Sequence, residues 1–249
     1  MEFPSMKLQF LGSGDAFGSG GRLNTCFYVR DQNGAFLVDC GASSMIAIRK
    51  FGVDPNAIRA VLITHLHGDH FGGLPFFILD AQLVSRRTAP LTVAGPPGLR
   101  DRLTTALENF FPGSTKVERR FPIDIRELEP RVAHDVEGIE VTPYVVRHAC
   151  GAPPFALRLK VDGKVLCYSG DTEWVDDLRE AAQDADLFIV ETYFYDKQVK
   201  FHLDYATLAR HLPEIGAKRV ILTHMSPDML ARVAPSGCEM ADDGFVVLL

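Results

Sequence analysis

The chain has 249 residues, of which 47% are hydrophobic and 23% charged, so it is long and apolar enough to bury a large core. With 26 Lys and Arg residues against 32 Asp and Glu residues, its formal net charge is −6. Affinity for long nucleic acid comes from Lys and Arg that displace counterions from phosphates, so this balance excludes a broad nucleic-acid-binding face but not a small phosphate-bearing substrate.

The five cysteines are far apart in the sequence and form no CxxC pair, which argues against a disulfide framework and against a cysteine-based zinc site. Residues 1–7 contain no basic region followed by an apolar stretch, so we expect no signal peptide. The sequence has no run of about 18 apolar residues that could span a membrane. We therefore expect a cytoplasmic protein without membrane contact.

The first half of the chain alternates short apolar runs, typical of buried strands, with longer segments of helical spacing. A Gly-rich loop at residues 12–21 follows the first run. Strands are expected over residues 7–12, 25–29, 35–39, 60–64 and 91–94, and helices over residues 43–51, 73–85 and 97–110.

The second half repeats this mixture. Strands are expected over residues 139–146, 155–161, 165–168, 187–190, 219–223 and 245–249, and helices over residues 174–182 and 204–212. Because no linker, charge block or low-complexity segment separates the halves, the pattern predicts a single domain over residues 1–249. Its class is α/β, with two β-sheets and helices outside them.

The strongest chemical signal is the stretch of three histidines and one aspartate directly after the strand expected at residues 60–64. On an extended chain, residues two apart point to the same side, so His65 and His67 can converge on one ion. Asp69 and His70 follow where the chain should turn into the next helix, and they can face a second ion. Imidazole nitrogens and carboxylates are ligands that zinc prefers, so this stretch predicts a metal site.

One short stretch cannot fill two metal sites, so further ligands must come from elsewhere in the chain. His148, Asp171 and His224 each follow an expected strand, at the point where that strand emerges from the core. The stretch after residues 60–64 has the same position relative to its strand. This shared position favours a common site.

These motifs, with the strand-end Asp39, resemble the metallo-β-lactamase superfamily of binuclear metallohydrolases over nearly the whole chain. The resemblance implies an αββα sandwich of two mixed β-sheets flanked by helices, with the site at one edge between the sheets. It implies two divalent metal ions, with zinc as the first choice and manganese or iron as alternatives. By the same resemblance, one ion takes His65, His67 and His148, the other takes Asp69, His70 and His224, Asp171 bridges the two, and Asp39 orients ligands.

Within the superfamily, the sequence is most similar to the ribonuclease Z-like phosphodiesterase branch. Residues 10–16 resemble the opening Gly-rich loop of that branch, and residues 190–193 resemble its glutamate motif. His202 falls where the branch keeps a histidine that contacts phosphate and helps the leaving group depart, although residues 202–204 do not follow the His-Ser-Thr pattern of the ribonuclease itself. Glu191 could hold that imidazole in one tautomer, so we take His202, Glu191 and Asp69 as candidate catalytic residues.

The interval from His148 to Asp171 is short and mostly needed for a hairpin, whereas the tRNA-processing members carry a long inserted arm there. This departure disfavours tRNA 3′-end processing. We therefore expect a binuclear hydrolase in which a metal-bridging hydroxide attacks a small phosphodiester or a nucleotide.

Several alternatives stay open at this point. The same metal cage can hydrolyse a lactone, a thioester or a β-lactam, and a metal-bound sensor without turnover would carry the same ligands. The expected partner is a small-molecule phosphodiester rather than long nucleic acid or a membrane. A homodimer is an open alternative, because exposed strand edges pair in similar proteins.

Overall fold

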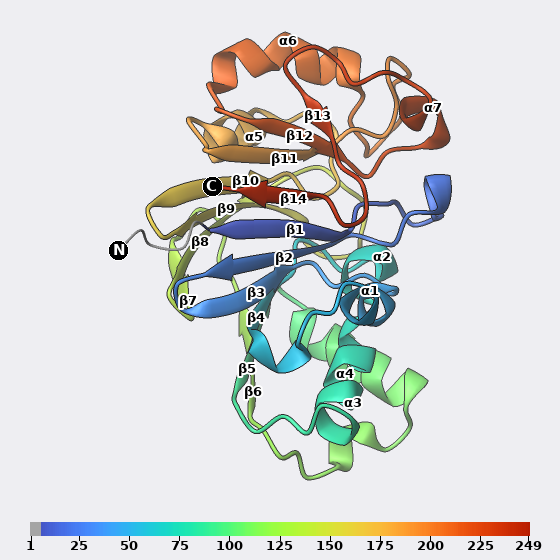
Figure 1. Cartoon of the computed structure of the whole chain (residues 1–249), viewed down its shortest axis with the longest axis vertical. Helices are drawn as coiled ribbons and strands as arrows, with labels where there is room; N and C mark the ends of the chain where they lie inside the picture. The colour runs from blue at the N-terminus through green and yellow to red at the C-terminus, as the bar shows by residue number, and fades with distance from the viewer. Residues whose placement is uncertain (1–5) are drawn as a thin grey trace.

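A computed structural model describes residues 6–249 as two seven-stranded β-sheets packed face to face, with helices on both outer faces (Figure 1). The predicted αββα sandwich of two mixed sheets is confirmed. Most of the start of the chain, where we expect no signal peptide, falls in residues 1–5 and lies outside the described residues. In the part that is described, no helix is both long and apolar enough to cross a membrane.

The first sheet combines antiparallel pairing on one side with parallel pairing on the other. Its strands β14 to β3 are antiparallel to their neighbours, and its strands β3 to β6 are parallel. In spatial order it contains β14 (Val246–Leu248), β1 (Lys7–Gly12), β2 (Cys26–Asp31), β3 (Gly34–Val38), β4 (Ile58–Leu62), β5 (Leu91–Gly95) and β6 (Ile123–Glu127).

The second sheet has the same mixed construction. Its strands β13 to β10 are parallel, and its strands β10 to β7 are antiparallel. In spatial order it contains β13 (Glu239–Met240), β12 (Val220–Thr223), β11 (Leu187–Glu191), β10 (Lys164–Tyr168), β9 (Phe155–Val161), β8 (Ile139–Val145) and β7 (His134–Val136).

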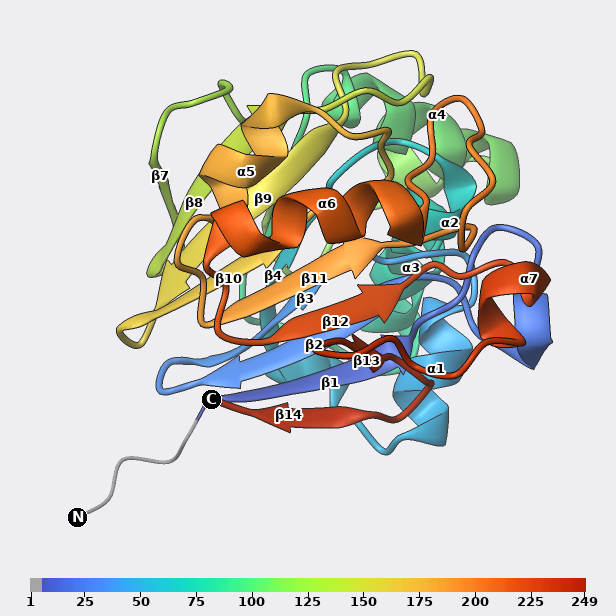
Figure 2. The same ribbon diagram turned by 90° about the horizontal axis from the view of Figure 1, so that it is seen from above.

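Helices cover the outer faces of both sheets (Figures 1 and 2). The first sheet carries α1 (Ser44–Lys50), α3 (Leu74–Leu83) and α4 (Leu99–Phe110), and the second carries α5 (Asp176–Ala182) and α6 (Tyr205–Ile215). Figure 2 shows α6 lying along β11 and β12. The short helices are α2 (Gly68–Phe71) and α7 (Pro227–Leu230), with 3₁₀ turns η1 (Ser19–Gly21), η2 (Pro55–Ala57) and η3 (Ser114–Lys116).

The alternation of side chains along each strand produces the layered core. In β1, Leu8 and Phe10 face the space between the sheets, whereas Leu11 packs on the helical side. Phe27 of β2 lies at the centre of the inner layer, with its ring 4.8 Å from that of Phe10 and 4.9 Å from that of Tyr168 in the opposite sheet. Both sheets therefore share one apolar interior.

Replacement of Phe27 by Ala is expected to lower the free energy of unfolding by about 3–5 kcal/mol, the usual cost of deleting a buried aromatic ring. The ring is fully buried and joins the two sheets, so the surrounding strands cannot collapse into the space that it leaves. Urea unfolding monitored by circular dichroism measures this change. An exposed aromatic change, Phe17→Ala, is the control and should shift stability by less than about 0.5 kcal/mol.

Three strands of the structure are absent from the sequence-based prediction, namely β6, β7 and β13. β6 and β7 are the last strands of their sheets at one edge, and β13 is the last strand at the other edge of the second sheet. Edge strands bury little apolar surface, and two of these have only two or three residues. They therefore lack the apolar runs from which the other strands were predicted.

Candidate metal centre

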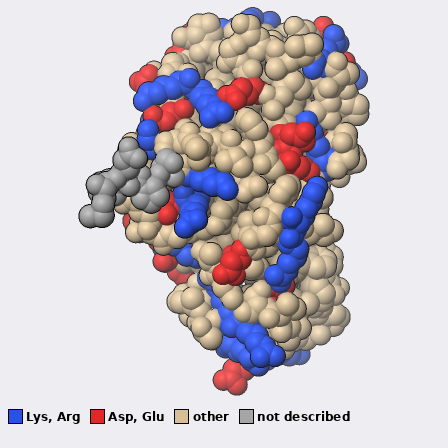
Figure 3. Space-filling model, in the orientation of Figure 1, with Lys and Arg blue, Asp and Glu red and all other residues tan. Residues whose placement is uncertain are grey.

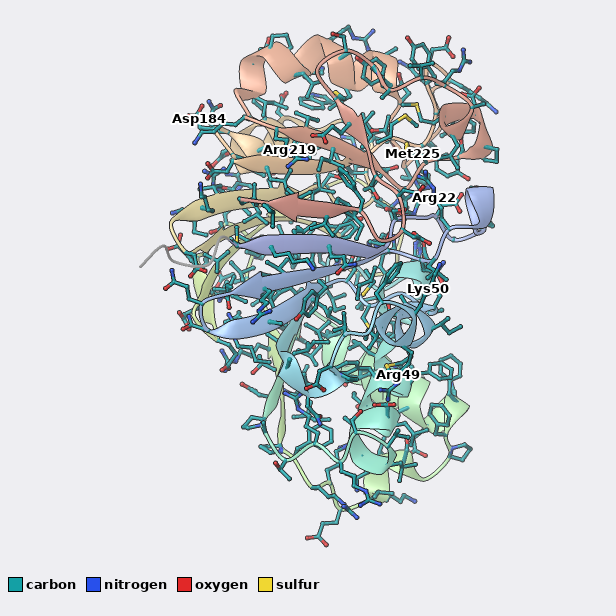
Figure 4. All side chains as sticks on the ribbon, in the orientation of Figure 1. Arg22, Arg49, Lys50, Asp184, Arg219 and Met225 are labelled. Atoms are coloured by element: carbon teal, nitrogen blue, oxygen red, sulfur yellow. The ribbon has the colours of Figure 1, made fainter. Side chains whose placement is uncertain are left out.

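The predicted site residues meet at one end of the two sheets, where the carboxyl ends of the strands emerge. His65 and His67 follow β4, and Asp69 and His70 lie in α2. His148, Asp171 and His224 follow β8, β10 and β12. Figure 4 labels Met225, the residue after His224, near Arg22, the residue that follows the Gly-rich loop, and both lie at this end of the sheets.

The seven side chains form two adjoining groups. In each group, one potential ligand atom of every residue lies within 4.8 Å of the others. The first group contains His65, His67 and His148, and the second contains Asp69, His70, Asp171 and His224. This grouping is the one that the family resemblance implies, with Asp171 placed in the second group.

The carboxylate of Asp171 lies between the two groups. Its Oδ1 is 3.2 Å from His70 Nε2, and its Oδ2 is 3.3 Å from His224 Nε2. The same Oδ2 is 3.9 Å from the Nε2 atoms of both His65 and His148. Asp171 is thus close to histidines of both groups, as a bridging ligand must be.

The remaining contacts draw the other side chains toward the same point. Asp69 Oδ2 lies 3.2 Å from His224 Nε2 and 3.3 Å from His70 Nε2. In the first group, His148 Nε2 lies 3.0 Å from His67 Nδ1. Ring nitrogens and carboxylate oxygens from four separate loops therefore face a common space.

Outer contacts hold three of the imidazoles by Nδ1, so that Nε2 faces this space. His70 Nδ1 donates to Asp39 Oδ2 at 2.7 Å, and His65 Nδ1 donates to Thr64 Oγ1 at 3.1 Å. Thr64 in turn donates to Asp39 through its backbone N–H and its hydroxyl. His148 Nδ1 donates to the backbone carbonyl of Phe201 at 2.9 Å. Metal-binding histidines typically have such a partner on the second ring nitrogen.

The Asp39 turn approaches the metal-site loop so closely that only glycine fits beside it. A Cβ atom on Gly41 would lie 2.1 Å from the backbone oxygen of Asp69. Cys40 N–H donates to the carbonyl of His70 at 2.7 Å, and Asp39 itself has a φ of +59°. The turn after β3 therefore packs directly on α2 and brings the Asp39 carboxylate to His70.

The electrostatics of the second group favour positive charge at its centre. Burial raises the pKa of Asp69, but His70 and the hydrogen bond from His224 outweigh this effect and lower that pKa well below its usual range. Burial lowers the pKa of His224, but the charge of Asp171 and the hydrogen bond to Asp69 raise it to about 9. The two carboxylates thus stabilise positive charge at this point, as they would the charge of a divalent cation.

Unpartnered buried atoms show that these residues fit a metal ion. His65 Nε2, His70 Nε2 and Asp171 Oδ1 are buried and make no hydrogen bond of good geometry among the described residues, although the last two atoms lie only 3.2 Å apart. Buried polar atoms are nearly always satisfied, and three orphans within one cluster point to a missing partner. Imidazole nitrogen and carboxylate oxygen are suitable donors for zinc, manganese or iron. The types of donor atom, and the lack of hydrogen bonds to three of them, therefore match a divalent metal centre.

A cavity of about 500 Å³ opens beside the centre. It is lined by His67, Asp69, His148, Asp171 and His224 of the cluster, together with His202, Tyr193, Phe194, Lys200 and Phe17. Glu191 lies fully buried behind it, and its Oε1 and Oε2 are 3.2 and 3.1 Å from His202 Nδ1. The candidate catalytic pair thus adjoins the metal centre, with His202 on the cavity wall.

Glu191 also fixes the turn that carries Asp171. The backbone N–H of Thr172 donates to Glu191 Oε1 at 2.5 Å, and the Glu191 N–H donates to Ser169 Oγ at 2.9 Å. Burial lowers the pKa of His202, but the hydrogen bond and charge of Glu191 outweigh this effect and raise it. The carboxylate therefore both orients the imidazole and favours its cationic form.

The sequence did not indicate several other groups around the centre. The hydroxyl of Thr64 and the carbonyl of Phe201 each hold an imidazole, but neither a lone Thr nor a backbone carbonyl leaves a recognisable motif. The other two histidines lie away from the centre, as expected. His134 in β7 contacts the backbone of Glu129, and His211 in α6 stacks on Trp174 with ring centroids 3.8 Å apart.

Comparison with known proteins identifies similar chains over almost the whole length. The model of the family described as anti-Pycsar protein Apyc1 matches residues 6–245. A ribonuclease Z of Bacillus thuringiensis (strain Al Hakam) is 28% identical over 278 aligned positions, which cover 89% of each chain.

Solved structures agree with this similarity. The short form of human tRNase Z is 26% identical and superposes with a TM-score of 0.80, covering 97% of this chain and 98% of that one. The metallo-β-lactamase-fold protein YhfI of Bacillus subtilis is 21% identical, with a TM-score of 0.77 and coverage of 98% and 99%. The αββα sandwich described above is thus the fold of these proteins.

Proposed function

Because the chain belongs to the anti-Pycsar protein Apyc1 family, within the ribonuclease Z-like branch of the metallo-β-lactamase superfamily, we propose that it is a metal-dependent hydrolase that cleaves small phosphodiesters. The observation that carries this proposal is the buried Glu191 paired with His202 on the wall of the cavity beside the metal centre. A phosphodiester offers such a pair both a negatively charged phosphate and a leaving-group oxygen, whereas a lactone, thioester or β-lactam carries no phosphate charge to stabilise.

We assign the two groups of side chains to two divalent ions. His65, His67 and His148 would hold one ion and Asp69, His70 and His224 the other, and Asp171, which lies near histidines of both groups, would be shared between them. The histidine-rich donor set favours zinc, while the carboxylates also admit manganese or iron. When bound, such ions act as Lewis acids toward a phosphoryl oxygen and help generate the nucleophile from water.

The residues of the chain supply positioning and proton transfer. Glu191 accepts a hydrogen bond from His202 Nδ1, which leaves Nε2 of that imidazole for the substrate. A cationic imidazole at this position stabilises negative charge on the phosphate and donates a proton to the departing oxygen. The raised pKa of His202 keeps it in this cationic form to higher pH than an ordinary histidine.

Three features support a small substrate rather than precursor tRNA. The chain between His148 and Asp171 consists of a short loop and the β9–β10 hairpin, with no room for an inserted arm. The ribonuclease Z alignment spans 278 positions, more than the 249 residues of this chain, so that relative contains residues which this chain lacks. On the face shown in Figure 3, Lys and Arg are interspersed with Asp and Glu.

A panel of substrates tests the proposal. With added Zn²⁺ or Mn²⁺, we expect turnover of bis-p-nitrophenyl phosphate at a rate at least about 100-fold above that of a lactone or a thioester, because a cationic His202 is placed to stabilise the negative charge of a phosphate. Release of p-nitrophenol, lactone opening and free thiol are followed by absorbance. Preferred turnover of the lactone or the thioester would contradict the proposal, and so would cleavage of precursor tRNA without cleavage of small diesters. Inactivity on the whole panel would favour a metal-bound sensor.

A further inference from the structure

The residue before His202 has an unusual backbone conformation. Phe201, in the loop between β11 and α6, has a φ of +71°, a left-handed value that bulky side chains rarely adopt. Its carbonyl accepts the hydrogen bond from His148 Nδ1 at 2.9 Å. One strained residue thus orients an imidazole of the metal centre through its carbonyl, and its successor in the chain is the histidine on the cavity wall. Such strain persists only where neighbouring groups enforce it.

Glu173 contacts the other backbone group of the same residue, the N–H of Phe201. Its Oε1 accepts a hydrogen bond from the backbone N–H of Phe201 at 2.9 Å. Its own backbone N–H donates to the carbonyl of Arg147, the residue before His148, at 3.1 Å. Glu173 is therefore bound through its side chain to the segment of His202 and through its backbone to the segment of His148.

Neighbouring hydrogen bonds fix the backbone of residues 171–173 against the segment that carries His148. Thr172 Oγ1 accepts from the N–H of Arg147 at 3.0 Å, and Arg147 and Glu173 form an antiparallel bridge. Thr172 N–H donates to Glu191, the partner of His202. Residues 171–173 thus form a fixed platform that carries Asp171 at one end and the Glu173 carboxylate at the other.

Packing alone does not fix the Phe201–His202 segment against this platform. A polar cavity of about 190 Å³ lies beside the segment, lined in part by Glu173, Trp174, His202, Asp204 and Thr207. Space on this side means that the segment can shift if its hydrogen bond is lost. The Glu173 carboxylate lines this cavity, and its hydrogen bond to the Phe201 N–H anchors the segment on this side.

We propose that Glu173 is a positioning residue that sets the geometry of His148 and His202 together, through the backbone of Phe201. Its side chain lines neither the cavity beside the metal centre nor the group of metal-facing atoms, so it acts through its hydrogen bond to the Phe201 N–H. For the role of His202 the inference rests on the proposed function, whereas the effect of Glu173 on His148 is measured by metal binding alone. Loss of the anchor lets the Phe201 carbonyl turn away from His148 Nδ1.

The ion pair of Glu173 with Arg147 offers a competing explanation, because the two side chains approach to 3.9 Å. The Arg147 side chain is 66% exposed, and exposed ion pairs contribute little. Arg147→Ala removes this ion pair and leaves the backbone contacts of residue 147 in place, so it serves as the matched control. Glu173→Gln keeps an oxygen that accepts from Phe201 N–H and removes the charge.

The test compares Glu173→Ala, Glu173→Gln and Arg147→Ala in the full chain. Zn²⁺ affinity is measured by competition with a chromophoric chelator in the absence of substrate, and kcat and KM are measured on bis-p-nitrophenyl phosphate. For Glu173→Ala we expect the zinc affinity of the site that includes His148 to fall about 10- to 100-fold, with a kcat lower by about 10-fold and KM within about 3-fold of wild type. Glu173→Gln and Arg147→Ala should stay within about 3-fold of wild type in every quantity.

Two results would overturn the proposal. The first is a Glu173→Ala variant that unfolds at a lower temperature but keeps the zinc affinity of wild type. The second is a Glu173→Gln variant as defective as Glu173→Ala, which would mean that charge rather than the hydrogen bond matters. If wild type binds zinc but cleaves no diester, the proposed function fails, while the affinity comparison still decides the role of Glu173.

Discussion

The variant Asp171→Asn is expected to lose bound metal and turnover together, with kcat/KM reduced by about 1,000-fold or more. This exceeds the roughly 10- to 100-fold cost of losing an outer partner of a metal ligand, because Asp171 contacts imidazoles of both groups. Asparagine has nearly the same shape but no charge, so the change removes the central negative charge of the cluster and leaves the packing in place.

Metal content by mass spectrometry after gel filtration, together with diester turnover, measures this effect. Asp176→Asn is the control, because Asp176 is an exposed carboxylate at the start of α5 that forms an ion pair with Arg179, away from the cluster. Circular dichroism establishes that both variants are folded. Retention of two metal equivalents and near-normal turnover in Asp171→Asn would refute the assignment of Asp171 as the shared ligand.

The residues of the candidate metal centre were the part of the molecule whose proximity was most readily predicted from the sequence. His65, His67, Asp69 and His70 form a dense motif directly after an apolar strand, and the chemistry of their side chains limits what such a motif can do. His148, Asp171 and His224 were found because they follow strands whose apolar runs are clear. The carboxyl ends of β8, β10 and β12 lie at the same end of the sandwich, so position along the chain translated directly into position in space.

What the sequence did not reveal depends on contacts between segments that are distant in the chain. The carboxylate of Glu173 meets the N–H of Phe201, which is 28 residues away, and a backbone N–H has no sequence signature. The left-handed φ of Phe201 is set by these tertiary contacts, since Phe itself disfavours it. The supporting shell of a site is therefore harder to predict than its ligands.

The variant His202→Ala is expected to lower kcat by about 100- to 1,000-fold while metal stays bound, because His202 contributes charge stabilisation and a proton rather than a coordination bond. Glu191 pairs with Nδ1 of this ring, so Glu191→Gln should give a smaller loss in the same direction. The measurements are kcat, KM and metal content on the same preparations. His211→Ala, which removes a histidine stacked on Trp174 away from the centre, is the control.

The choice of leaving group makes this prediction sharper. A p-nitrophenolate leaves readily without a proton, whereas an alkoxide needs one, so the loss in His202→Ala should be about 10-fold or more larger for a diester with an alkyl leaving group. An equal loss on both substrates would contradict proton donation and assign His202 to the charge on the phosphate. A fall in metal content in step with activity would instead make His202 a ligand. Metal content must therefore be measured, because one ring nitrogen of His202 lies within 4.8 Å of ligand atoms of His148 and Asp171, close enough for His202 to share in metal binding.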